Sequence, residues 1–408
     1  MYSSFKDYGN DAMAYCEVRP VVANSMKSAK EVFTEMLNDP NHVFKYDYVY
    51  IPVDSSQVIK NNVVNKIYHE AINDTMFVRI GNRGSLALNQ SLPLDMIAKN
   101  AENGWTRPIY YAVTVPNSYH LGLTPYLQQT GMAYQVTPAI TGVDGDNGIN
   151  VDKMYDVVTN KYLWGGLDKS NDLYLDETVR RMVTTTRGTL LSLADELYIN
   201  GMIEAQNDST NKVAGKEYFD KARNVLHLLE EKLPASAMPF EHLTELEVAR
   251  LYLKLSEQTG NKDDMNRAKT IVDGSFNRYV KHIPYLMSLN DYQLRHIIRE
   301  EQHIPNRALP HLITLWQQVG GDIDKKLNEL GISITDVMGL RLRFLQCENP
   351  NHEIMAFIPS MIEYYNMLNY KPENYIDALA QLFGKYNLSR NDIETILSKA
   401  VAKHAQAE

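Results

Sequence analysis

The sequence contains few cysteines for its length of 408 residues. Its two cysteines, Cys16 and Cys347, lie far apart and match no metal-ligand or redox spacing, which excludes a disulfide framework. So small a number fits a cytoplasmic protein, and it fits equally well a large periplasmic domain whose core needs no cross-links. The cysteine content therefore leaves the compartment open.

The sequence also lacks the short motifs of the common enzyme classes. It contains no G-x-S-x-G nucleophile elbow, no H-E-x-x-H, no phosphate loop ending in Gly-Lys-Ser/Thr and no G-x-G-x-x-G. Hydrolase, metalloprotease and dinucleotide-binding interpretations thus lose their usual support. We assign no catalytic residue, no cofactor and no metal ion from the sequence.

Long basic or apolar runs are missing as well. The formal net charge is −9, the pI is near 5.7, and no basic run exceeds a Lys-Lys or Arg-Arg pair, which argues against nucleic acid and anionic lipid as partners. Residues 1–9 lack the basic and apolar segments of a signal peptide. The apolar stretch 354–368 is interrupted by Pro359 and Glu363 and is too short to cross the roughly 30 Å of a bilayer core. We expect either a cytoplasmic protein or the exported part of one whose membrane segment precedes Met1.

The first third of the chain predicts an α/β domain. Runs rich in aromatic and β-branched residues predict strands at 46–51, 76–80, 108–115 and 132–138, and helices are expected at 55–61 and 92–100. The run 108–115 is apolar on nearly every residue, which is typical of a strand buried on both faces. We therefore expect a small, mostly parallel sheet with covering helices, ended by a loop rich in Gly, Asn and Asp at 141–150.

After residue 176 the periodicity changes to that of helices, which predicts an all-α array. Helices are expected at 176–200, 213–233, 243–258, 263–280, 291–303, 308–319, 333–345, 355–368, 375–385 and 389–405. Small residues in two successive hairpins (Ala194, Ala222, Ala249 and Ala268) match the tetratricopeptide pattern, although insertions such as 205–212 lengthen the repeat. We expect an α/β domain at 1–150, a hinge at 151–175, tetratricopeptide-like repeats at 176–332 and C-terminal helices at 333–408.

Two strings of residues are long enough to be specific. They are Asn103-Gly-Trp-Thr-Arg-Pro-Ile-Tyr110 and Trp164-Gly-Gly-Leu-Asp168. Together with 51–54, 131–138 and 154–155, they resemble the soluble C-terminal region of bacterial protein O-mannosyltransferase-like membrane proteins, a family also catalogued as a domain of unknown function. The resemblance is best over 46–187 and extends to about 280.

In that family, a multi-spanning N-terminal part resembles lipid-phosphosugar-dependent glycosyltransferases, and the exported C-terminal part leads into tetratricopeptide-like helices. The resemblance implies that this chain lies on the periplasmic side of the inner membrane, and that the membrane part, with its acidic catalytic loop, lies upstream of Met1. Trp105 and Trp164 each stand beside glycine and are expected to anchor turns. We group with them, as hinge or structural residues, Arg107, Gly165, Gly166 and Asp168.

Three weaker groups of residues suggest ligand sites. The turn from Gly81 to Ser85, with Arg79 and Arg83, could direct backbone N–H groups toward an anion, although a turn that needs glycine is the simpler explanation. A loop carries calcium-type oxygen ligands but lacks the glycine and the terminal glutamate of an EF-hand: Asp144, Asp146, Asn147 and Asn150. A predicted helix places possible metal ligands on one face, as surface helices also do by chance: His296, Glu300 and His303.

Two classes of function remain open. In the first, the chain is a non-catalytic binding or scaffolding module: its helices present a concave surface to a protein or peptide, such as an acceptor protein, and its α/β part docks onto a membrane transferase. In the second, the α/β domain binds glycan or carries an enzymatic site at the C-terminal ends of its strands, an idea supported by the 26 tyrosines. We favour the first, because the strand ends offer no nucleophile–base pair. The second requires the following residues to converge: Asp54, Arg79, Arg83, Asn117, Tyr119 and His120.

Overall fold

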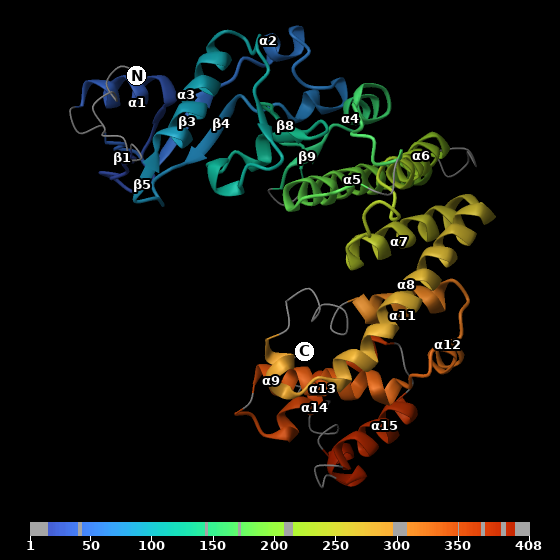
Figure 1. Cartoon of the computed structure of the whole chain (residues 1–408). Coiled ribbons are helices and arrows are strands. Elements are labelled where there is room, and N and C mark those ends of the chain that lie inside the picture. Colours follow the sequence, from blue (N-terminus) through green and yellow to red (C-terminus); the bar gives the residue numbers. More distant parts are fainter. Residues whose placement is uncertain are drawn as a thin grey trace. The chain divides into compact units, whose positions relative to one another are not determined.

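A computed structural model describes residues 15–39, 43–142, 146–169, 173–207, 215–296, 308–349, 351–368, 372–384 and 389–395. The chain divides into two compact units, Met1–Gly165 and Gly166–Glu408. All described strands belong to the first unit, and the described elements of the second are helices (Figure 1). The predicted order, an α/β part followed by a helical part, is confirmed. The finer boundaries at 150, 175 and 332 stay predictions.

The described strands of the first unit form three small sheets. In the first, β1 (Tyr15–Glu17) pairs with β5 (Ser85–Ala87). The second has the order β2 (Met26–Ser28), β3 (Tyr48–Pro52) and β4 (Thr75–Arg79). The third has the order β6 (Tyr110–Ala112), β8 (Ala133–Val136), β7 (Leu127–Gln129) and β9 (Gly148–Ile149). The strands predicted at 46–51, 76–80 and 132–138 correspond to β3, β4 and β8.

The prediction of one mostly parallel sheet is wrong. Among the described strands, β2–β3 and β7–β9 are parallel, and the other pairs are antiparallel. The strand expected at 108–115 is reduced to β6, where Tyr110 and Ala112 are exposed and Tyr111 is buried. The Tyr110 hydroxyl lies 3.0 Å from Lys153 Nζ, on the solvent side. Because a tyrosine can cover apolar surface and still reach water, an aromatic run does not require a strand buried on both faces.

Helices cover the strands of the first unit. Helix α1 (Ala29–Asn38) packs against α3 (Leu88–Glu102), and both contact β3. Helix α2 (Ser55–Lys60) follows β3, and α4 (Val151–Asp156) follows β9. The expected helices 55–61 and 92–100 are thus confirmed, whereas α1 and α4 were not expected. One apolar core runs through this unit from Cys16 to Ala139.

The second unit contains a succession of helices. They are α5 (Glu177–Asn207), α6 (Lys216–Lys232), α7 (His242–Thr259), α8 (Lys262–Ser288), α9 (Asp291–Arg295), α11 (Leu309–Gln318), α12 (Ile323–Glu329), α13 (Ile334–Glu348), α14 (Ile358–Met367) and α15 (Pro372–Gly384). Each except α12 was predicted, with ends that differ by a few residues in most cases. The expected helices 291–303 and 389–405 run beyond the described residues, which stop at 296 and 395.

Helices α5 to α8 form two hairpins. Helix α5 packs along α6 and α7 along α8, while α7 also contacts α5 and α6. The small side chains expected between them are fully buried, namely Ala194, Ala222, Ala249 and Ala268. Helix α11 packs on α7 and α8, with the Trp316 ring centroid 5.4 Å from that of Phe276. The close pairing is therefore present, and the tetratricopeptide assignment stays a prediction.

Gly201 marks a close approach of α5 and α6. A Cβ atom placed there would lie 2.6 Å from a ring carbon of Phe219, whereas one at Gly188, on the same helix, would meet nothing within 4 Å. We expect Gly201→Ala to lower the free energy of unfolding by about 1–3 kcal/mol through overpacking. Gly188→Ala should raise it by about 0.5–1 kcal/mol through helix propensity. Urea unfolding followed by circular dichroism compares the two variants, and equal effects would contradict the close approach.

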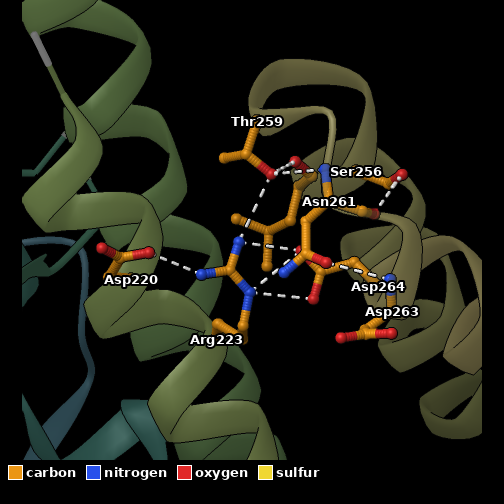
Figure 2. Close-up of polar contacts among 8 residues, drawn as sticks. Asp220, Arg223, Ser256, Thr259, Asn261, Asp263 and Asp264 are labelled. Carbon is orange, nitrogen blue, oxygen red and sulfur yellow. Dashed lines mark hydrogen bonds and ion pairs between the residues drawn. The ribbon is translucent and has the colours of Figure 1, made fainter. Parts of the chain in front are cut away.

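An arginine on α6 ties the two hairpins together (Figure 2). Arg223 donates from Nε and Nη2 to the carboxylate of Asp264, near the start of α8, over 2.8–2.9 Å. Its Nη1 donates to Asp220 over 2.6 Å, and its Nη2 lies 3.4 Å from Thr259 Oγ1. Asp264 is only 2 % exposed, so its carboxylate is withdrawn from water. The ion pair with Arg223 offsets the cost of desolvating that charge.

A second arginine holds the connection between α6 and α7. Arg187 on α5 is fully buried, and burial lowers the pKa of its guanidinium to about 10. Its nitrogens donate to backbone carbonyls rather than to a carboxylate: Leu233 O (2.8 Å), Pro234 O (3.3 Å), Met238 O (2.6 Å) and Pro239 O (3.1 Å). The guanidinium also lies 3.8 Å from the ring centroid of Phe240. Arg187 therefore fixes the path of a segment that has no regular secondary structure of its own.

Candidate functional site

The glycine-rich turn after β4 encloses the side chain of Asp47. The N–H groups of Ile80 and Gly81 both donate to Asp47 O over 2.9 Å. A Cβ at Gly81 would overlap the Asp47 carboxylate, and Arg79 Nε lies 3.5 Å from Asp47 Oδ1. Gly81 is thus explained by close packing, and Arg79 already has an anionic partner within the chain. Arg83 Nε, in the same turn, is buried without a hydrogen-bond partner among the described residues.

The antiparallel pairing of β3 and β4 separates two of the predicted ligand-binding residues. Asp54, just after β3, caps α2 by accepting from the N–H groups of Ser56 (3.0 Å) and Gln57 (3.2 Å). Hydrogen bonds from the Ser56 hydroxyl and the Gln57 N–H lower the pKa of Asp54. Arg79 pairs with Tyr48 at the other end of β3, roughly 13 Å along the strand from Pro52. Asp54 and Arg79 therefore lie at opposite ends of their sheet.

The last three predicted ligand-binding residues follow β6 in a short 3-10 turn. Asn117 is exposed, Tyr119 is half-buried, and Asn117 O accepts from the N–H of His120 over 3.0 Å. His120 is only 1 % exposed, and its ring centroid lies 5.1 Å from that of Tyr111 and 6.0 Å from that of Tyr134. The imidazole is part of the core and is not presented to solvent. The six predicted residues do not gather at one point of the surface.

The buried His120 predicts a pH dependence of folding. Neither ring nitrogen has a hydrogen-bond partner among the described residues, and desolvation lowers the pKa of His120. The groups that face it, Tyr111 and Tyr134, are phenols whose pKa burial raises, so they stay neutral. The unfolded histidine ionises near pH 6.5, above the folded one. Its contribution to stability is therefore complete above about pH 6.5 and is lost as the pH falls through the folded pKa.

We expect the His120→Phe variant not to show this loss of stability at low pH, because phenylalanine keeps a ring in the core but has no group that titrates. The measurement is the free energy of unfolding of the first unit between pH 5 and pH 7.5, followed by amide hydrogen exchange. His282→Gln, at an exposed position on α8, is the matched control and should keep the wild-type pH dependence. An unchanged slope in His120→Phe would contradict the assignment.

The string from Asn103 to Tyr110 begins with a tight turn at the end of α3. Gly104 and Trp105 both adopt the left-handed conformation, with φ of +68° and +59°, which is uncommon for a residue other than glycine. The N–H of Trp105 donates to Asn100 O (2.8 Å), and the N–H of Arg107 donates to Asn100 Oδ1 (3.1 Å). Asn61 Nδ2 donates to Gly104 O over 2.6 Å. Trp105 lies in the core, and Arg107 is exposed at the surface.

The string from Trp164 to Asp168 spans the division between the two units. In the first unit, Trp164 packs edge-to-face on Tyr162, with ring centroids 5.4 Å apart. Gly165 ends the first unit, and Gly166, with φ of +84°, begins the second. Asp168 accepts from Lys232 Nζ at the end of α6 over 3.1 Å, and this hydrogen bond lowers the pKa of Asp168. Each half of the string is thus anchored within its own unit.

The described residues include no group of three or more His, Cys, Asp or Glu side chains that could hold a metal ion. Of the calcium-type ligands, Asn150 caps α4 by accepting from the N–H of Lys153. Of the helical ligands, His296 stacks on Tyr292 with ring centroids 4.3 Å apart. The following candidates lie outside the described residues: Asp144, Glu300 and His303.

The chain was compared with known families, with curated proteins and with solved structures. Residues 3–154 match the family model described as TMEM260-associated domain 2. The matched segment contains all of the predicted ligand-binding residues and the turn at Trp105, and it ends before the helical unit begins. No curated protein and no solved structure matches the chain. Within the part of the chain that the structure describes, we find no helix with the length and apolar character needed to cross a bilayer.

Proposed function

We propose that this chain is a non-catalytic module of a membrane glycosyltransferase-like protein and that its helical unit binds a protein or peptide. Two observations support the link to a membrane protein. Residues 3–154 match a domain named for its association with TMEM260. The strings at 103–110 and 164–168 resemble the exported region of protein O-mannosyltransferase-like proteins. In this proposal the membrane part precedes residue 1 and the chain lies on the exported side.

Two isoleucines on the surface of α5 carry the proposal for the helical unit. Ile199 and Ile203 lie one helical turn apart and are 42 % and 51 % exposed. The opposite side of the same helix, with Leu190, Ala194 and Gly201, is buried, and Gly201 lies against Phe219 of α6. An apolar pair left outside the hairpin is suited to contact with another protein, as on the surfaces of helical repeat arrays.

The test of partner binding uses the chain as bait on membranes from the source cells. The variant Ile199→Ser/Ile203→Ser is expected to lose the partner that the wild-type chain retains. Val21→Ser/Val22→Ser removes two exposed apolar residues from the first unit and should retain it. Retention by the α5 variant, or equal loss from both variants, would rule out α5 as the binding surface.

The link to a membrane protein is tested by fractionating the source cells with an antibody against this chain. The expected result is a membrane-bound band much larger than the 46.6 kDa calculated for the chain. A band near that mass in the soluble fraction would overturn this part of the proposal. That result would not decide whether α5 binds a partner, which the binding experiment tests separately.

A further inference from the structure

A pocket in the first unit opens between the end of α2, with the segment that follows it, and the start of α4. It has a volume of about 490 Å³, which is within the range of small-molecule sites. Its described lining comes from the segment 59–69, from Gln135 on β8, and from Asn150, Asp152 and Lys153. All of these positions lie within the residues 3–154 that match the family model.

The ammonium group of Lys153 is held at this pocket by neutral acceptors. Its Nζ donates to Gln135 Oε1 over 2.7 Å and to the Tyr110 hydroxyl over 3.0 Å. Gln135 is only 6 % exposed, and its Nε2 donates in turn to Val63 O over 3.4 Å. An ammonium has three N–H donors, and neither acceptor carries a charge that would neutralise it. Because Lys153 is exposed, its remaining donor and its positive charge are available to a ligand.

A second cation lines the pocket from another segment. Lys66 and His69 lie in the 3-10 turn Lys66–Ala71, where side chains three residues apart project on the same side. Lys66 is exposed, His69 is half-buried, and both line the pocket. Among the described residues, no carboxylate forms an ion pair with Lys66. A ligand oxygen can therefore contact Lys66 Nζ from solvent without entering the core.

Asp152 is the one acidic residue in the described lining. Its carboxylate accepts from Asn65 Nδ2 over 3.3 Å and forms no ion pair with Lys66 or Lys153. The described lining thus carries two ammonium groups and one carboxylate. This is a net positive charge in a chain whose formal net charge is −9. A pocket with this charge attracts an anion.

Another pocket of the first unit, between α1 and α3, shows the difference that pairing makes. Its two lysines are each paired with a carboxylate: Lys30 Nζ lies 3.3 Å from Glu102, and Lys99 Nζ lies 2.7 Å from Asp95. Those charges are compensated within the chain. Of these two pockets, the one at Lys66 and Lys153 is therefore the one whose charge an anion would neutralise.

The kind of cation indicates the kind of anion. The described lining contains lysines and no arginine, so it lacks the planar set of donors that matches the two oxygens of a carboxylate. A phosphate monoester has three terminal oxygens and close to two negative charges at neutral pH, so it can accept from both lysines at once. Ile59, which is 40 % exposed, and the half-buried Val63 add apolar surface for the organic part of such a ligand.

We propose that this pocket binds a small organic phosphate monoester. The phosphate accepts hydrogen bonds from the ammonium groups of Lys66 and Lys153 beside His69, and the organic group lies against Ile59 and Val63. The site lies in the first unit and goes beyond the function proposed above. It depends neither on the α5 surface nor on the link to a membrane protein, so the proposals can fail separately.

The test is calorimetric titration of the full chain with phenyl phosphate, benzoate and benzyl alcohol. We expect phenyl phosphate to bind with a Kd of about 1 mM or tighter, benzoate to bind about tenfold more weakly or less, and benzyl alcohol not to bind. The three compounds share an aromatic ring and differ in charge, so the series separates phosphate binding from apolar contact. If phenyl phosphate does not bind at millimolar concentration, or if either other compound binds as tightly, the proposal is wrong.

Two variants test the named cations. Lys66→Met and Lys153→Met each remove one ammonium group and should weaken the binding of phenyl phosphate about tenfold or more. Lys60→Met removes the same charge from an exposed position at the end of α2, outside the described lining, and should change the affinity by less than about twofold. Wild-type affinity in both pocket variants, or an equal loss in Lys60→Met, would contradict the assignment.

Asp152→Asn tests the charge of the pocket in the opposite direction. It keeps an oxygen that can accept from Asn65 Nδ2 and removes the negative charge of the described lining, so phenyl phosphate should bind about threefold more tightly or better. Damage to the pocket would weaken binding, so a gain in affinity identifies an effect of charge. Unchanged or weaker binding by Asp152→Asn would count against the proposal.

Discussion

Replacing Arg187 by methionine is expected to lower the free energy of unfolding of the second unit by about 3–5 kcal/mol, a large part of the stability of an ordinary domain. Methionine fills much of the same space but offers no donor, so the carbonyls of Leu233 and Met238 would lose their charged partner at a buried site. The segment between α6 and α7 would then have to open toward water or keep unsatisfied acceptors. Urea unfolding followed by circular dichroism measures the loss.

Two comparisons separate the loss of the Arg187 carbonyl contacts from the effect of removing an arginine at any other position. Arg181→Met on the same helix removes an exposed residue whose partner, Glu177, is also exposed, and it should change stability by less than about 1 kcal/mol. Arg187→Lys keeps the charge but not the planar set of donors, so an intermediate loss is expected. Equal stability of Arg187→Met and Arg181→Met would show that the carbonyl contacts contribute little.

Removing the carboxylate of Asp264 is the second change with a large expected effect. Asp264→Ala should cost about 3–5 kcal/mol, because Arg223, which is itself mostly buried, would lose its main partner between the hairpins. The double variant Arg223→Met/Asp264→Leu removes both charges, and it should recover most of that loss, since a buried ion pair often contributes little beyond an apolar contact.

Asp220 provides the control for this pair. It binds the same guanidinium, but its side chain is 52 % exposed, so Asp220→Ala should cost less than about 1 kcal/mol. Thermal unfolding of the four proteins gives the comparison. If the double variant is as unstable as Asp264→Ala, then the loss reflects the shape of the site and not an uncompensated charge.

The sequence predicted the helices well because their signals are local. The apolar period that placed α5 to α8 depends on residues three and four apart, which lie on one face of the same helix. Helix α1 was missed although its signal was present: the Ser28 hydroxyl oxygen accepts from the N–H of Glu31 over 3.4 Å, an N-cap that Ser followed by Glu three residues later indicates.

The arrangement of the strands was not predictable by the same reasoning. Apolar and polar residues alternate along β3 in the same way whether β4 runs parallel or antiparallel to it. The pattern therefore does not predict the direction in which the two strands pair. The expected site at the strand ends required parallel neighbours that would bring Asp54 and Arg79 together. In the antiparallel pair these residues are separated, and the geometric basis for a glycan or enzymatic site there is lost.

The most buried polar contacts also had no sequence signature. Arg187 binds carbonyl groups, which every residue possesses, so nothing in residues 233–239 marks them as its partners. His120 follows an exposed turn and reads as a surface residue, but its ring enters the core between Tyr111 and Tyr134. The turn after α3 contains a left-handed tryptophan, Trp105, a conformation that the residue type does not suggest.

The pairing of β1 with β5 has a consequence for the synthesis of the chain. Tyr15 pairs with Ala87, so β1 lacks its sheet partner until the ribosome has made and released the segment that contains β5, although the carbonyl of Glu17 can accept from the N–H of Phe44 earlier. At about 5–20 residues per second this delay is on the order of several seconds, during which the edge of β1 is open to incorrect pairing. Helix α5, in contrast, meets α6 as the next helix to emerge. Strand β1 therefore waits longer for its sheet partner than α5 waits for its helical partner.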